Sequence, residues 1–201
     1  MKRIFYILIL TIFTTTSSAQ DSKAYFGISL GYSVPGGESM EGINDGLELG
    51  FVNFGYRFSE NIGATLNLNS SGHTIDNVDD VNVGVAYLSF GPMISHQISD
   101  KILIDFKPQY APSLVAAYTD DSGQAYDDTE LRGGAFVLAN SIVFGNSKGF
   151  GFSINTDFLT GKWSSAEIDG QSLDLGSDLG YDEDDKKVTK FTISVGLRYN
   201  F

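Results

Sequence analysis

The chain has 201 residues, no cysteine, and 13 Lys and Arg against 25 Asp and Glu, which gives a formal net charge of −12. This acidity argues against a nucleic-acid partner, which needs a basic face, and the lack of cysteine excludes disulfide cross-links. The length suits one domain. Abundant Gly, Phe and Tyr with only 4 Pro favour strands over helices.

The N-terminus has the composition of a signal peptide. Two basic residues precede an apolar run over 4–13, and small residues lead up to Ala19. The run is shorter than the about 20 apolar residues that a spanning helix needs. We therefore predict a cleaved signal peptide over 1–19, export of the protein, and one mature domain over 20–201.

Apolar and polar residues then alternate with a period of two, which indicates half-buried strands. The alternation is cleanest in the last segment and ambiguous in the sixth, where Asn140 falls on the apolar face. Pro92 and Pro108 lie inside the fourth and fifth segments, and each predicts a bulge or bend. The eight segments are 26–33, 52–58, 62–69, 83–98, 102–110, 132–144, 150–158 and 190–201.

The connections alternate in length. Those over 59–61, 99–101 and 145–148 are tight, and the other four are long, polar and rich in acidic residues, with Glu48 at the edge of the first. The apolar strand faces carry almost no charge, as a bilayer requires, because a basic residue facing its centre costs about 2–4 kcal/mol. This layout predicts an all-β fold: an eight-stranded antiparallel up-and-down transmembrane barrel. A barrel free in the periplasm is the structural alternative.

The chain ends in Tyr199-Asn200-Phe201, with an aromatic residue third from the end and a terminal Phe. This ending resembles the C-terminal assembly signal of outer-membrane barrels, which implies that the barrel-assembly machinery recognises Tyr199 and Phe201. The mature chain resembles the outer-membrane β-barrel domain family, with its OmpX-like proteins and the N-terminal barrels of OmpA-like proteins. The junction after Ala19 resembles signal peptides common in Bacteroidetes. The resemblance implies the outer membrane of a Gram-negative bacterium, with outer-membrane lipids and lipopolysaccharide as neighbours, and it says little about activity.

If the apolar faces meet lipid, the alternate positions point into the barrel. An eight-stranded barrel is just wide enough for side chains to fill, and buried charges need partners. We predict a packed polar lumen in which Asp105 pairs with Arg57 or Arg198 near the periplasmic end, and Asp157 pairs with Lys190 nearer the outside. The predicted inward residues are Arg57, Asn67, Asn69, Asp105, Lys107, Gln109, Asn155, Asp157, Lys190 and Arg198.

No motif in the sequence indicates a cofactor or a dedicated metal site. Asp182, Asp184 and Asp185 in the last long connection are weak candidates for a hard cation such as Ca²⁺, but no stretch matches a calcium-binding loop. Two interpretations of the acidic connections stay open: a solvated, self-repelling surface, and loose divalent bridging to lipopolysaccharide.

Few residues in the sequence distinguish an enzymatic barrel from a non-enzymatic one. A lipid A acyl-chain hydrolase or transferase would need a nucleophile and a base, and Ser71, His73 and Asp76 are neighbours in sequence only. His96 lies near the periplasmic end. We predict a non-enzymatic barrel with a structural or surface-interaction role; the alternatives are a narrow channel or small-solute binder and the lipid-A-modifying enzyme.

Overall fold

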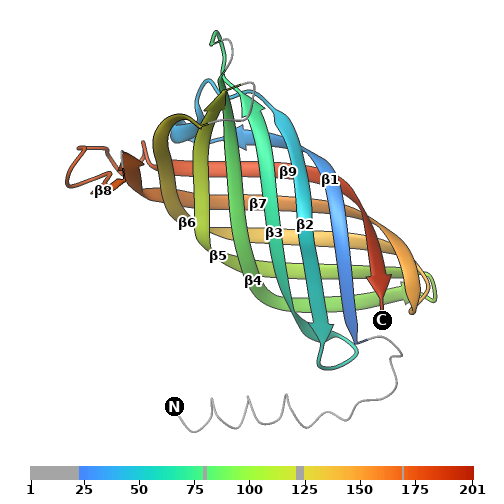
Figure 1. Ribbon diagram of the computed structural model, residues 1–201. Coiled ribbons are helices and arrows are strands. Elements are labelled where there is room, and N and C mark those ends of the chain that lie inside the picture. Colours follow the sequence, from blue (N-terminus) through green and yellow to red (C-terminus); the bar gives the residue numbers. More distant parts are fainter. Residues whose placement is uncertain (1–22, 79–80, 121–124, 169) are drawn as a thin grey trace, which may run out of the picture.

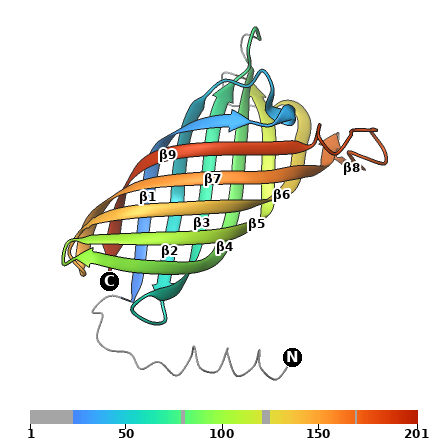
Figure 2. The same ribbon diagram turned by 180° about the vertical axis from the view of Figure 1, so that it is seen from behind.

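The computed structural model describes residues 23–78, 81–120, 125–168 and 170–201, and the predicted signal peptide lies outside them. The chain forms one antiparallel sheet that closes into a barrel (Figures 1 and 2). β9 closes the ring, because it pairs with both β1 and β7. The predicted class and the eight-stranded ring are thereby confirmed. The ring strands are β1 (Ala24–Gly36), β2 (Gly46–Arg57), β3 (Ile62–Thr74), β4 (Val81–Ser99), β5 (Ile102–Asp120), β6 (Ala125–Gly145), β7 (Gly149–Ile168) and β9 (Lys187–Asn200).

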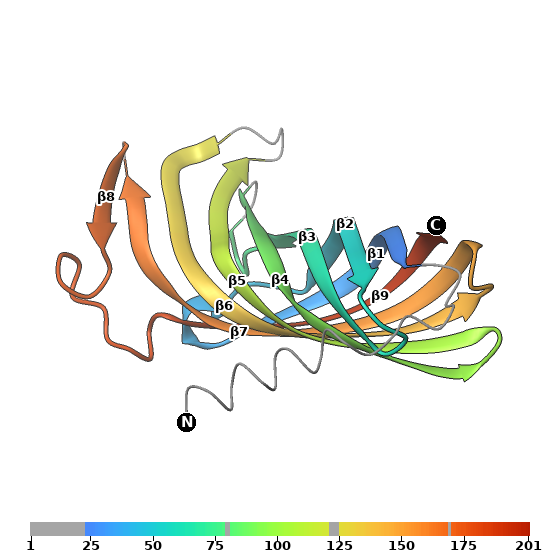
Figure 3. The ribbon, with the colours of Figure 1, turned by 90° about the horizontal axis from the view of Figure 1, so that it is seen from below.

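Two small elements lie outside the ring of eight strands. The 3-10 helix η1 (Glu38–Met40) lies between β1 and β2, and the short strand β8 (Gln171–Asp174) pairs with the outer end of β7. Figures 1 and 3 show β8 projecting from one end of the barrel, while the C-terminus and the tight turns lie at the other. Within the described residues, no helix is long and apolar enough to cross a bilayer.

The outward face carries a belt of large apolar side chains. In β9 all six positions that the alternation assigns to this face, from Phe191 to Phe201, are exposed, and their neighbours point inward. The period of two follows from the pleat of the strand, which turns successive side chains to opposite faces. The belt is the surface that suits hydrocarbon.

Most strands run further than the sequence predicts, mainly at the end with the long connections, and by one or two residues at the other end in β1, β4, β6 and β7. β5 reaches Asp120 and β6 begins at Ala125, so the expected third long connection is mostly strand. Glu130 and Glu167, expected near loops, sit on β6 and β7. Beyond the apolar belt water can solvate polar side chains on the outer face, so the membrane-type alternation ends while the hydrogen-bonded ladder continues.

The prolines of the fourth and fifth strands do not mark bulges. The register of β4 and β5 sets Pro92 opposite Pro108, and the ladder has no paired residues at that point. Both prolines stay in regular register with their other neighbours, β3 and β6. The two missing N–H groups fall at one place between the same strands, which limits the loss to one local break. The bulge in β5 lies instead at Pro112, between Ala111 and Leu114.

Candidate functional site in the lumen and at the outer end

A β-bulge in β2 decides which side chains enter the lumen. The pairing of β2 with β3 shifts between Gly50 and Val52. As a result Leu49 and Phe51 face outward and Glu48 is buried inside the barrel. Without the bulge, the alternation that begins at Val52 would turn Glu48 outward. The prediction that Glu48 belongs to the first acidic connection is wrong, because Glu48 lies on β2 and is buried in the lumen. One extra residue exchanges the two faces of a strand.

Asp105 on β5 lies between two arginines at the tight-turn end of the lumen. Arg57 Nη2 donates to its Oδ1 at 3.4 Å, and Arg198 Nη1 donates to its Oδ2 at 2.5 Å. Ser95 Oγ also donates to Oδ1, at 2.6 Å. All four residues are buried. Charge-assisted hydrogen bonds to both carboxylate oxygens offset the cost of burying these ions, and the structure brings Asp105 to both arginines that the sequence offered as alternatives.

Tyr25 on β1 supports this cluster from one side. The guanidinium carbon of Arg198 lies 3.4 Å from the centre of the Tyr25 ring, and that of Arg57 lies 5.9 Å away. Such stacking of a cation on an aromatic face is attractive. The sequence reading missed Tyr25; its place in the inward series with Gly27 was the available signal. Gly55 on β2 makes room for the ring, since a Cβ there would lie 2.2 Å from a ring carbon.

We therefore expect Gly55→Ala to destabilise the barrel by about 1–3 kcal/mol, the usual cost of overpacking, because the new methyl group displaces Tyr25 from Arg198. Gly72→Ala is the matched control, since a Cβ at Gly72 has no neighbour within 4 Å. Denaturant unfolding in detergent micelles measures both. Equal unfolding midpoints for the two variants would contradict the inference that Gly55 leaves room for the Tyr25 ring.

A second network fills the middle of the lumen. Lys190 on β9 forms an ion pair with Glu48 and donates to Ser71 Oγ at 3.0 Å. The predicted pair of Lys190 with Asp157 is therefore wrong, and Asp157 accepts a hydrogen bond from Asn69 Nδ2 at 3.4 Å instead. The Lys190 ammonium lies over the Tyr87 ring, 4.7 Å from its centre.

The other predicted inward residues between these networks are also buried. Lys107 Nζ donates to Ser141 Oγ at 2.7 Å. Gln109 Oε1 accepts from Asn67 Nδ2 at 3.2 Å and from Ser89 Oγ at 2.9 Å. These bonds cross between strands, so the inner half of the barrel is held by side chains as well as by the sheet. Together these side chains fill this part of the lumen, and most of their polar groups are paired.

Much of the outer half of the interior is apolar, beside a few buried polar side chains such as Ser71 and His73, which corrects the prediction of a polar lumen throughout. The two faces of β7 exchange polarity along the strand: Phe152 and Phe158 point out near the tight turn, whereas Leu159 and Trp163 point in further along. Beyond the apolar belt the outward side chains are mostly polar, so the barrel needs an ordinary hydrophobic core inside. The buried cluster comprises Met40, Val83, Val85, Tyr87, Ala111, Leu114, Ala116, Ala135, Val137, Ala139, Leu159, Trp163, Ala166, Leu175 and Val188.

The connection between β1 and β2 closes this core from above. Met40 of η1 is part of the buried cluster. The Trp163 indole N–H donates to Ser39 Oγ at 3.1 Å, and Ser39 in turn donates to the carbonyl oxygen of Lys187 at 2.6 Å. This connection is therefore tied to β7 and β9, across the opening of the barrel.

Ser71 and His73 do meet in space. His73 Nε2 lies 2.9 Å from Ser71 Oγ, and its Nδ1 lies 2.9 Å from the carbonyl oxygen of Asn44. The carbonyl of Asn44 takes the orienting place that Asp76 would hold in a triad, and Asp76 is exposed. Ser71 and His73 are each 2 % exposed. A nucleophile must be reachable by its substrate, so this pair fits a tether for the β1–β2 connection better than catalysis.

Ion pairs order the outer connection between β8 and β9. Glu183 accepts from Lys162 Nζ and Lys186 Nζ, each at 2.6 Å. Asp184, one of the weak cation candidates, pairs with Lys187. The other two candidates face each other through a backbone bond, in which the Asp182 N–H donates to Asp185 Oδ2 at 3.1 Å. In the described part of the chain, no three His, Asp or Glu side chains gather as metal ligands.

The Glu183 carboxyl group is expected to titrate with a pKa lowered to about 2, because Lys162 and Lys186 both donate to it. Because the pKa is lowered in the folded state, these ion pairs contribute their full stabilisation at pH values above the ordinary pKa of 4.5. This stabilisation of the connection is lost as the pH falls towards 2. Carboxyl-carbon NMR against pH measures it, and Lys162→Met should raise the midpoint. A midpoint near 4.5 in the unaltered protein would show that the pairs do not form in solution.

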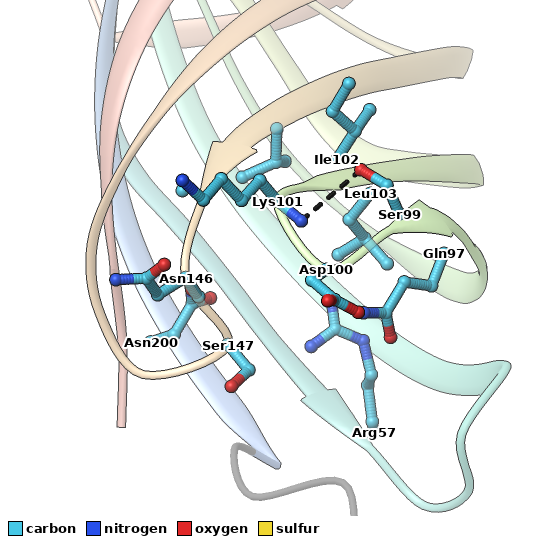
Figure 4. A pocket seen from close by; sticks show the side chains of 12 residues that line it. Arg57, Gln97, Ser99, Asp100, Lys101, Ile102, Leu103, Asn146, Ser147 and Asn200 are labelled. Carbon is cyan, nitrogen blue, oxygen red and sulfur yellow. Dashed lines mark hydrogen bonds between the residues drawn. The ribbon is translucent and has the colours of Figure 1, made fainter.

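The tight-turn end holds a shallow pocket of about 40 Å³ (Figure 4). Its wall includes Lys101 from the β4–β5 turn, Ser147 from the β6–β7 turn and Arg57 from the lumen. The pocket mixes one acidic residue, Asp100, with basic and amide groups. It lies at the mouth of the barrel and does not extend past the buried Arg57.

The predicted assembly residues lie on the outward face beside this end. Tyr199 packs edge-on against Phe150, with ring centres 5.0 Å apart, and against Phe201 at 5.2 Å. The Phe201 N–H donates to the carbonyl oxygen of Ala24 at 3.0 Å, which joins the two ends of the barrel wall. Their recognition by the assembly machinery stays a prediction.

No family model and no curated protein matches this sequence. The structure is similar to neisserial surface protein A, with a TM-score of 0.57 and 8% identity over 89% of this chain and 97% of that chain. It is also similar to the outer membrane protein OprG from Pseudomonas aeruginosa, with a TM-score of 0.52 and 11% identity over 92% of this chain and 99% of that chain. The chain thus has the fold of the small β-barrels of bacterial outer membranes.

Proposed function

We propose that this protein is a non-enzymatic, integral barrel of the outer membrane, with a closed interior and a structural or surface-interaction role at its outer end. The observation that carries the proposal is the burial of the inward side chains from one end to the other. The ion pairs of Asp105 fill the tight-turn end, the network of Glu48 and Lys190 fills the middle, and the core around Trp163 lies beyond it. A barrel filled in this way offers no wide path for solutes.

The outward belt supports the membrane location. Its side chains are large and apolar, and charged groups gather beyond it, as in the ion pairs of Arg132 with Glu130 and Glu167 on β6 and β7. On this proposal the lipid-facing belt contacts outer-membrane lipids and lipopolysaccharide. The barrel-assembly machinery would act on the strand that ends in Tyr199 and Phe201.

The outer end supports the surface role. Strands β4 to β7 continue past the belt, and β8 with its connection projects from the rim (Figure 3). Leu179 and Tyr181 are exposed on this connection next to several carboxylates. On this proposal these two side chains would be among the groups that meet a surface partner.

Two measurements test the two halves of the proposal separately. Outer-membrane fractions run on gels with and without boiling in detergent should show a faster band that vanishes on heating, which establishes a folded barrel in that membrane. Recovery in the periplasm with no heat shift would refute the location. Planar-bilayer recordings should then show no steady openings above those of protein-free bilayers, and reproducible openings would favour the channel alternative.

A further inference from the structure

Three buried side-chain atoms of the described residues have no hydrogen-bond partner within the protein. They are Oδ1 of Asn53, Oδ1 of Asn155 and Nη2 of Arg198. The three residues come from β2, β7 and β9, yet all of them line one small cavity in the lumen wall. Buried polar atoms in native proteins nearly always have partners, in the protein or in ordered water, so their coincidence in one cavity points to a shared ligand.

The chemistry of the three atoms defines that ligand. They are one guanidinium nitrogen, which donates, and two amide oxygens, which accept, so a ligand that meets all three must accept a hydrogen bond from Arg198 and donate one to each asparagine. The cavity leaves about 10 Å³ for the centre of a water molecule, close to the smallest space that holds one. A metal cation is disfavoured because the positively charged guanidinium of Arg198 would repel it. A halide is disfavoured because the two amide oxygens, which are also hydrogen-bond acceptors, would repel it. We propose that one ordered water binds here, accepting from Arg198 and donating to Asn53 and Asn155.

The neighbouring hydrogen bonds hold the three groups in place for this water. Arg198 Nε donates to Asn200 Oδ1 at 2.8 Å, and its Nη1 donates to Asp105, which leaves Nη2 for the cavity. Asn155 Nδ2 donates to Ser194 Oγ at 3.1 Å, and this bond turns the Asn155 oxygen away from Ser194. The water gives Nη2 of Arg198 the acceptor that the protein does not provide.

The position of the water gives it a role in closing the barrel. Asn53 is on β2, and Asn155 and Arg198 are on β7 and β9, so the bridge spans the seam where β9 pairs with β1. It joins the first strands of the chain to the last ones. It also supports the Arg198 side of the ion pair with Asp105.

A crystal structure of the full barrel at about 1.8 Å, with a second crystal grown in bromide, tests the proposal. The expected result is one density peak within about 2.7–3.2 Å of all three atoms, without anomalous signal from bromide. An anomalous peak would assign the site to a halide. Absence of any peak, with Asn53 or Asn155 rotated onto a protein partner, would overturn the site.

Water-to-amide NMR transfer in nanodiscs provides a solution test. The side-chain amide of Asn155 should show transfer from a long-lived water, whereas that of Asn67, which is bonded to Gln109 and does not line the cavity, should show none. Asn53→Leu, checked for folding by its heat shift on gels, should abolish the Asn155 signal. An Asn155 signal that persists unchanged in this variant would refute the three-way bridge.

Discussion

Asp105→Asn is expected to lower the free energy of unfolding by about 3–5 kcal/mol, the range for breaking a buried ion pair. Asp105 is fully buried and is the shared carboxylate of Arg57 and Arg198. Asparagine keeps the size of the side chain but removes its charge, so two guanidinium groups remain in the barrel with no carboxylate between them. These bonds connect β5 by side chains to β2 and β9, which are not its neighbours in the sheet, and they are charge-assisted and therefore stronger than neutral ones.

Denaturant unfolding of the refolded barrel, followed by the fluorescence of its single tryptophan, Trp163, measures this loss. Asp100→Asn is the matched control, because this substitution removes the same charge from an exposed residue of the β4–β5 turn at the same end of the barrel. We expect the control to change stability by less than about 0.5 kcal/mol. A similar small change for Asp105→Asn would mean that the arginines are solvated through the mouth and do not need this carboxylate.

Glu48→Gln is expected to cost about 3–5 kcal/mol for the same reason, because it removes the carboxylate that is paired with the buried Lys190. Asp157→Asn should cost clearly less, since Asp157 is bonded to an amide, Asn69, and asparagine can still accept that bond. The comparison separates the pairing found in the structure from the one that the sequence predicts.

A double-mutant cycle with Lys190→Met makes this test sharper. Lys190→Met with Glu48→Gln should be less destabilising than the sum of the two single variants, because the second change removes a charge that the first has left unpaired. Lys190→Met with Asp157→Asn should be nearly additive. Strong coupling to Asp157 and none to Glu48 would restore the sequence-based pairing and contradict the bulge in β2.

The sequence determined the architecture of this protein. Alternation with a period of two, together with uncharged apolar faces, determines which side chains face lipid on β9 and on the inner half of β7, because the bilayer admits no other arrangement. The same alternation places Arg57, Asp105 and Arg198 inside, and a narrow barrel leaves these charges few partners other than one another. Fold class, strand number and this cluster could therefore be predicted from local patterns.

Only the tertiary structure decided the rest, because those features depend on register and on contacts between distant strands. A single bulge in β2 carries Glu48 into the lumen and gives Lys190 its partner. In the sequence it shows only as a change of phase between Phe51 and Val52, and the register with β3 is needed to locate it. Pro92 and Pro108 face each other because of the register in which β4 pairs with β5. The apolar outer core appears where the strands run past the apolar belt, since polar side chains cover the outside there and the apolar residues turn inward.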